Sequence, residues 1–217
     1  MRYTNIKGGA PDTADGSQES VITADTFKNA TKLKDFRVIS NNLGSGFPTL
    51  KNKIDENAFT FNTSLEVLEI NSGGSLSGGI SQLFSNNPNL RSLNLTNNGF
   101  TGSPPNFLNN SSLTYVNLSN NQLNGIIPSY SGNIQELRLE NNQLTQINAP
   151  GTLASLNTYQ AHNNAIGGNV PDFSGSKNVR SITLNNNKFT GYTDGAFTQL
   201  YKINYIDLSF NHLSSTS

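Results

Sequence analysis

The residues able to carry chemistry are few and scattered along the chain. The two histidines, His162 and His212, lie in different parts of the sequence, and neither belongs to an H-E-x-x-H or another metal-ligand spacing. Neither a phosphate-binding G-x-x-x-x-G-K-[ST] loop nor a G-x-S-x-G nucleophile elbow occurs. The acidic run from Asp12 to Gly16 resembles a calcium-binding loop but lacks the ligand at the first position and the closing Glu. We therefore expect no enzymatic activity, no metal and no cofactor.

An internal repeat dominates the chain instead. The eleven-residue pattern LxxLxLxxNxL recurs eight times, and its apolar positions alternate with polar ones, as in a short strand with one buried face. Successive copies are 32, 25, 23, 21, 22, 23 and 24 residues apart. The copies start at residues 33, 65, 90, 113, 134, 156, 179 and 203. Such regularity predicts parallel strands stacked one on the next, with the first, fourth and sixth positions pointing inward.

Two further rows keep the register of the repeat. The motif asparagine should satisfy backbone groups where the chain turns at the end of each strand, and we expect a structural role for it. This row comprises Asn41, Asn98, Asn121, Asn142, Asn164, Asn187 and Asn211. The second copy has Gly73 in this position and Leu76 one place late, which predicts a loosened turn. Six residues before each start lies an aromatic row, expected to form a core spine under the convex side. It comprises Phe27, Phe59, Phe84, Phe107, Phe173 and Phe197, with Pro128 and Pro150 in two repeats.

Several copies continue as L-x-G-x-I-P, for example from Leu123 to Pro128 and from Ile166 to Pro171. The chain thus resembles leucine-rich repeat proteins, with plant-type extracellular copies mixed with bacterial-type copies such as the one containing Phe197. The resemblance covers roughly residues 21 to 213. It implies an α/β solenoid, a horseshoe or superhelix with about eight short parallel strands on the concave face, little regular helix and a second short strand on the flank.

Composition and the two ends limit the remaining possibilities. The net charge is zero and 13% of residues are charged, which gives no electrostatic footprint for nucleic acid or an anionic membrane. Residues 1–20 read as a flexible arm, and residues 21–217 as one solenoid without a C-terminal cap. We expect the edge at Ile206, Leu208 and Leu213 to be covered by a partner, a second copy or a continuation. No signal peptide is visible, and the absence of cysteine departs from secreted eukaryotic members of the family.

The concave face is where a ligand would be recognised, because its outward side chains form columns across the repeats. Exposed Tyr, Arg and mixed polar groups suit such a surface, and no large apolar patch is expected, which favours a protein or a surface glycan. The candidate ligand-binding residues are Tyr115, Arg138, Glu140, Gln160, His162 and Tyr205. The alternative is that they are merely solvated strand residues.

Three functions remain compatible with the sequence. The first is a virion-surface decoration or host-attachment protein, which fits the absent leader, cysteines and cap together. The second is a secreted or cell-surface ectodomain of receptor or adhesin type, which the L-x-G-x-I-P turns support by resemblance. The third is a proteinaceous enzyme inhibitor. Each places the chain on a virion surface or outside a cell, and each is a recognition role.

Overall fold

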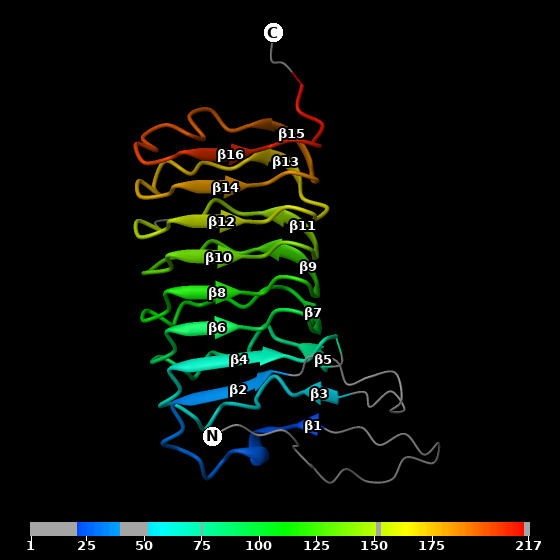
Figure 1. Cartoon of the computed structure of the whole chain (residues 1–217), viewed down its shortest axis with the longest axis vertical. Coiled ribbons are helices and arrows are strands. Elements are labelled where there is room, and N and C mark those ends of the chain that lie inside the picture. The colour runs from blue at the N-terminus through cyan, green and yellow to red at the C-terminus, as the bar shows by residue number, and fades with distance from the viewer. Residues whose placement is uncertain (1–20, 40–51, 75, 151–152, 215–217) are drawn as a thin grey trace, which may run out of the picture.

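The computed structural model describes residues 21–39, 52–74, 76–150 and 153–214. Within these ranges the chain is a β-solenoid in which each turn contributes one strand to each of two sides (Figure 1). The only helical element among them is the short 3-10 helix η1(Ala24–Thr26). The expectation of a solenoid of parallel strands with little regular helix is confirmed.

Eight strands make one long parallel sheet, which Figure 1 shows as a ladder of arrows. The order in the sheet follows the order of the repeats, because each strand pairs with the strand one repeat away and the connection between the two passes through the other side of the solenoid. These strands are β2(Asp35–Ile39), β4(Val67–Asn71), β6(Ser92–Asn94), β8(Tyr115–Asn117), β10(Glu136–Arg138), β12(Thr158–Gln160), β14(Ser181–Thr183) and β16(Tyr205–Asp207).

The flank carries the second strand that the L-x-G-x-I-P copies implied. Six of its strands form one sheet and the last two form a separate pair. These strands are β1(Val21–Ile22), β3(Asn52–Ile54), β5(Leu76–Gly79), β7(Gly99–Gly102), β9(Gln122–Ile127) and β11(Gln143–Ile147), followed by the pair β13(Gly167–Val170) and β15(Lys188–Tyr192). The flank also extends beyond the L-x-G-x-I-P copies, since Ile22 pairs with Ile54 in parallel register.

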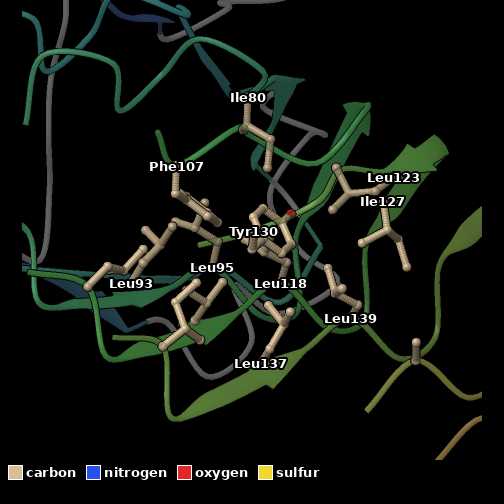
Figure 2. Close-up of a cluster of buried hydrophobic side chains, with 14 of the residues drawn as sticks. Ile80, Leu93, Leu95, Phe107, Leu118, Leu123, Ile127, Tyr130, Leu137 and Leu139 are labelled. Carbon is tan, nitrogen blue, oxygen red and sulfur yellow. The ribbon is translucent and has the colours of Figure 1, made fainter. Parts of the chain in front are cut away.

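The inward positions of the motif fill the space between the two sides. Leu93, Leu95, Leu118, Leu137 and Leu139 are all fully buried, and Figure 2 shows them converging on the rings from the return segments. Alternation with period two produces this result, because every second side chain of a strand faces the interior. The hydrophobic interior is therefore one continuous column that runs along the stack.

The motif asparagines connect each turn to its neighbour. Asn121 illustrates the pattern: its Nδ2 donates to the carbonyl oxygens of Leu95, Leu118 and Ser119 at 2.8, 3.1 and 3.1 Å. Its Oδ1 accepts from the backbone N–H of Phe100 at 3.1 Å. Equivalent bonds are made by Asn98, Asn142, Asn164, Asn187 and Asn211. Asn41 lies outside the described residues.

The second repeat solves the turn in a different way, because Gly73 has no side chain to offer. The Ser72 hydroxyl accepts from Leu76 N–H at 2.8 Å and donates to Asn98 Oδ1 at 2.5 Å. Gly73 and Gly74 adopt φ values of 65° and 91°, a region that favours glycine. The Ser72 hydroxyl therefore takes over part of the role of the missing amide.

The aromatic row lies inside the solenoid for most of its length. Phe59, Phe84, Phe107 and Phe173 are at most 4% exposed, whereas the outer members Phe27 and Phe197 are partly buried. Ring pairs link Phe27 to Phe59 at 5.9 Å and Phe173 to Phe197 at 6.4 Å between centroids.

At the first of the two prolines in this row, another ring occupies the interior. Tyr130, two residues after Pro128, stacks on Phe107 at 5.4 Å and is 3% exposed (Figure 2). The sequence register alone did not identify this tyrosine. The reason is that this repeat is the shortest, so the return segment reaches the interior at a different residue.

Candidate functional site

The outward side chains of the long sheet form the surface on which recognition was expected, and we call this surface the wall. Strand pairing aligns its central column residue by residue. This column reads Arg37, Glu69, Asn94, Asn117, Arg138, Gln160, Thr183 and Asp207. Because neighbouring strands lie about 4.8 Å apart, an extended ligand along the axis would meet one member of each column per repeat.

The candidate residues do not all lie together. Arg138 pairs with Gln160 across β10 and β12, and Tyr115 lies on the adjacent strand β8 opposite Glu136. Glu140 and His162 follow these strands on the same side of the sheet. Tyr205 lies on β16, separated from β12 by β14, so it belongs to a different part of the wall.

Arg138 is bound to acidic groups of its own strand. Its Nε donates a short hydrogen bond to Glu136 Oε1, two residues earlier. Burial acts to lower the pKa of Arg138, but the Glu136 bond, the Glu136 charge and the nearby Glu140 charge outweigh it and raise the pKa. The guanidinium is thus a fixed cation between carboxylates, and its charge is already compensated before any ligand arrives.

Glu140 is less exposed than expected for a residue of the wall. We expect an accessible residue of the wall at this position, but Glu140 is only 9% exposed. Its Oε2 atom is buried and has no hydrogen-bond partner. A buried carboxylate oxygen without a donor lowers stability, because it loses its hydrogen bonds to water without replacing them.

The far end of the wall is organised around Asp207. Hydrogen bonds from Ser209 lower the pKa of Asp207, and Tyr205 and the nearby His162 contribute in the same direction. The Ser209 N–H lies 2.9 Å from Asp207 Oδ1, and the Tyr205 hydroxyl lies 3.4 Å from Oδ2. His162 Nδ1 lies 3.2 Å from Thr183 Oγ1. Tyr205 and His162 therefore share an electrostatic environment although two strand steps separate them.

The first two strands carry a similar arrangement. Arg37 donates from Nε to Asp35 at 2.9 Å and from Nη1 to Glu69 at 3.1 Å. Asp35 first, and Glu69 to a smaller extent, raise the pKa of Arg37. Asn94 also donates to Glu69, at 3.2 Å. Arg37, Asp35 and Glu69 are not among the candidate residues from the sequence, because the sequence alone does not show that these ion pairs form.

A second ladder of amides borders the wall and was also missed. Asn141 donates to Asn120 at 2.8 Å, Asn163 to Asn141 at 2.7 Å and Asn186 to Asn163 at 2.7 Å, all between side chains. All four residues are exposed and have φ between 53° and 57°, a conformation that asparagine tolerates better than most residues. The signal in the sequence was the Asn-Asn doublet that ends five of the motifs.

The described part of the chain offers neither a metal site nor a membrane-spanning helix. No group of three or more His, Asp or Glu side chains there is placed to hold a metal ion. No helix in the same ranges has the length and apolar character needed to cross a bilayer.

Comparison with known proteins assigns the repeats. A model described as a BspA type leucine rich repeat region matches residues 20–167, and a leucine rich repeat model matches residues 173–217. No curated protein matches the chain.

Several solved structures are similar to the chain. The plant peptide hormone receptor RGFR1, in complex with RGF2, is 24% identical with a TM-score of 0.73, over 93% of this chain and 32% of the receptor. A plant ice-binding protein is 26% identical with a TM-score of 0.61, over 75% of this chain and 54% of that protein. An internalin from Listeria monocytogenes is 21% identical with a TM-score of 0.58, over 85% of this chain and 50% of the internalin. The chain therefore spans between about a third and about half of these proteins.

Proposed function

The chain belongs to the leucine-rich repeat family, and on that premise we propose that it is a non-enzymatic recognition module whose wall binds an extended segment of a partner. The observation that carries the proposal is the alignment of polar columns over eight paired strands. A rigid sheet holds these side chains at a fixed spacing, so little conformational entropy is lost from the wall when a ligand binds. Tyr115 and Tyr205 supply aromatic side chains of the kind that dominate binding energy in interfaces.

An extended peptide or a flexible protein segment fits this surface better than a compact partner. The columns run along the solenoid axis, and half of their residues are Ser, Thr, Asn or Gln, which can bond the backbone of an extended chain. Structures similar to this chain include receptors in complex with peptides, namely RGFR1 with RGF2 and the Arabidopsis receptor kinase HAESA with the peptide hormone IDA. A surface glycan is the other ligand that polar columns of this kind could bind.

The setting that we propose is extracellular, as part of a receptor or adhesin-type ectodomain. The neutral, polar composition and the similarity to the ectodomain of a plant membrane receptor kinase support it. A virion-surface decoration or host-attachment role is the second setting, favoured by the complete absence of cysteine. Mass spectrometry of purified virions separates the two, because only a virion protein remains with the particles through density-gradient purification.

A displayed library of random peptides, together with a glycan array, tests the function directly. We expect ligands whose affinity falls at least tenfold in the Tyr115→Ala/Gln160→Ala variant, since hot-spot truncations cost about 2 kcal/mol or more. Tyr201→Ala is the matched control, because Tyr201 is 81% exposed but precedes the strand and lies off the wall. Ligands that tolerate the double substitution as well as the control would contradict the proposal.

A second candidate function follows from the exposed Asn120–Asn186 ladder. Its uncharged amides repeat at the strand spacing of about 4.8 Å and could match an ordered water lattice, and the plant ice-binding protein is similar to this chain. Inhibition of ice recrystallisation by the purified chain tests the idea. Asn141→Asp/Asn163→Asp should abolish the inhibition, because it places negative charges in the ladder. Aspartate tolerates the positive φ of these positions, so the backbone should be unchanged. No inhibition by the unmodified chain would remove this candidate.

A further inference from the structure

We propose that the partner segment bound by the wall is basic, with lysine or arginine side chains spaced four to five residues apart. This inference rests on the proposed recognition function and names the chemistry of its ligand. Three lines of evidence support it: the charge of the wall, the spacing of its acidic sites and the unsatisfied carboxylate of Glu140.

The wall is acidic although the chain as a whole is neutral. Among the described residues that form its outward columns, five carry carboxylates and two carry guanidinium groups, which leaves a net charge of −3. The acidic residues are Asp35, Glu69, Glu136, Glu140 and Asp207, and the basic ones are Arg37 and Arg138. Complementary charge of this kind steers a basic ligand toward the wall and disfavours an acidic one.

The excess negative charge is divided into three sites. Arg37 lies between Asp35 and Glu69, and Arg138 is bonded to Glu136 with the charge of Glu140 close by, so each group retains one negative charge. At the third site Asp207 accepts hydrogen bonds from Ser209 and Tyr205, which are uncharged.

These three sites are evenly spaced. Glu69 lies on β4, the Glu136 group on β10 and Asp207 on β16, and three strand steps separate each site from the next (Figure 1). Three steps correspond to about 14 Å. An extended chain advances about 3.3 Å per residue, so about four or five residues cover that distance. The intervening repeats carry uncharged polar side chains in the central column, which suit the ligand backbone.

Glu140 gives an independent reason to expect a cationic donor. Its side chain is 9% exposed and its Oε2 has no partner, in the middle of the wall and beside an arginine already bonded elsewhere. An ammonium or guanidinium group from a ligand would provide the missing donor after a small side-chain rotation. Charge-assisted bonds of this type are the strongest that a polar surface offers.

Fluorescence anisotropy with three labelled 15-residue peptides tests the inference. Each has a Gly, Ser and Thr background; the first has three lysines spaced by four and five residues, the second has the three lysines adjacent, and the third has glutamates in the spaced positions. We expect the spaced lysine peptide to bind at least threefold more tightly than the clustered one at low salt, and the glutamate peptide not to bind.

A charge-matched pair of variants of the full chain locates the effect. Glu69→Gln/Glu140→Gln/Asp207→Asn should weaken the spaced peptide about tenfold or more. Asp55→Asn/Asp172→Asn/Asp194→Asn removes the same charge from exposed positions off the wall and should leave the affinity within about twofold. Circular dichroism and thermal melting establish that both variants are folded.

The outcomes separate this inference from the function on which it rests. Equal affinities for the spaced and clustered peptides, or equal losses in the two triple variants, would overturn the inference. If neutral or acidic peptides bind and Tyr115→Ala weakens them, the recognition function stands while the basic ligand is wrong. If library ligands of every charge bind independently of Tyr115 and Gln160, the function itself fails.

Discussion

At the scale of single residues, two groups of buried polar atoms in this protein have opposite effects on stability. The motif asparagines that the structure describes use their amides fully, and each one bonds several carbonyl oxygens and accepts from a backbone N–H. The hydroxyls of Tyr130 and Tyr159 are buried without a partner. The first group stabilises the turns, whereas the second reduces stability, because a buried polar atom loses its bonds to water.

Replacing a motif asparagine should therefore lower the free energy of unfolding substantially. Asn121→Ala removes four hydrogen bonds and leaves the Phe100 N–H without its acceptor, so we expect the free energy of unfolding to fall by about 3 kcal/mol. Urea denaturation followed by circular dichroism measures the change. Gln122→Ala, next to it but exposed, should stay within about 0.5 kcal/mol of the parent. A similar cost for both substitutions would argue against the structural role.

The two buried tyrosines predict a loss of stability at alkaline pH. Burial raises the pKa of Tyr130 and Tyr159 above the ordinary value of 10.0, and the charge of Tyr130 adds to the effect on Tyr159. Below pH 10 the two groups are neutral in both states and contribute no pH dependence. Above it the unfolded chain ionises while the folded chain does not, so stability falls by about 1.4 kcal/mol per pH unit for each group.

The Tyr130→Phe/Tyr159→Phe variant should lose this dependence. Between pH 10 and 11.5 its unfolding free energy should fall less steeply than that of the parent, by up to about 3 kcal/mol per pH unit. At neutral pH it should be at least as stable, because two unpartnered hydroxyls are gone. Tyr201→Phe, at an exposed position, serves as the control. Parallel curves for the parent and the double variant would show that the hydroxyls ionise freely in the folded state.

At the scale of elements, the strand and the return segment of a repeat are stabilised by different residues. The strands give mostly leucines to the interior, and in most repeats the return segment gives one ring, whereas the segment that contains Pro150 gives Leu153. The ring can come from the Phe row or, in the shortest repeat, from Tyr130, which stacks on Phe107. A phenylalanine at one fixed offset is thus not required, because the interior accepts Tyr130 in one repeat and Leu153 in another.

Two phenylalanines two residues apart, one inside the spine and one outside it, test the assignment of the spine. Phe59 is fully buried and contacts Phe27 and Phe36, whereas Phe61 is 47% exposed. Phe59→Ala should lower the free energy of unfolding by about 3 to 5 kcal/mol, because it leaves a cavity in the core. Phe61→Ala should cost less than about 1 kcal/mol. Chemical denaturation distinguishes the two, and equal costs would contradict the assignment of the spine.

At the scale of the whole molecule, stability comes from contacts between adjacent turns. Each strand of the long sheet pairs with its neighbours in the repeat order, so inner turns are held on two sides and β16 at the edge of the sheet on one. The terminal repeat also exposes Tyr205, Ile206 and Phe210. Local opening should therefore cost least at that repeat.

Hydrogen exchange checks this gradient of stability. We expect the amides of β8, β10 and β12 to exchange at least a hundredfold more slowly than those of β16, measured by mass spectrometry on peptic fragments. Uniform protection along the stack would show that the terminal repeat is held by contacts equivalent to those of the inner turns. If addition of a ligand slows amide exchange in β16 and in no other strand, that ligand binds at the terminal repeat.

The sequence by itself determined the stack, because the fold depends on local periodicity repeated at near-constant spacing. Leu93 and Leu95 face inward and Asn98 closes its turn, because the same pattern recurs in the neighbouring repeats on which they pack. The same register placed Arg138 beside Gln160. Tertiary structure alone decided which polar groups meet: the pairing of Arg37 with Glu69, the burial of Glu140 and the use of Tyr130 as a spine ring. These depend on side-chain reach and repeat length across turns, and an alternating pattern contains no information about either.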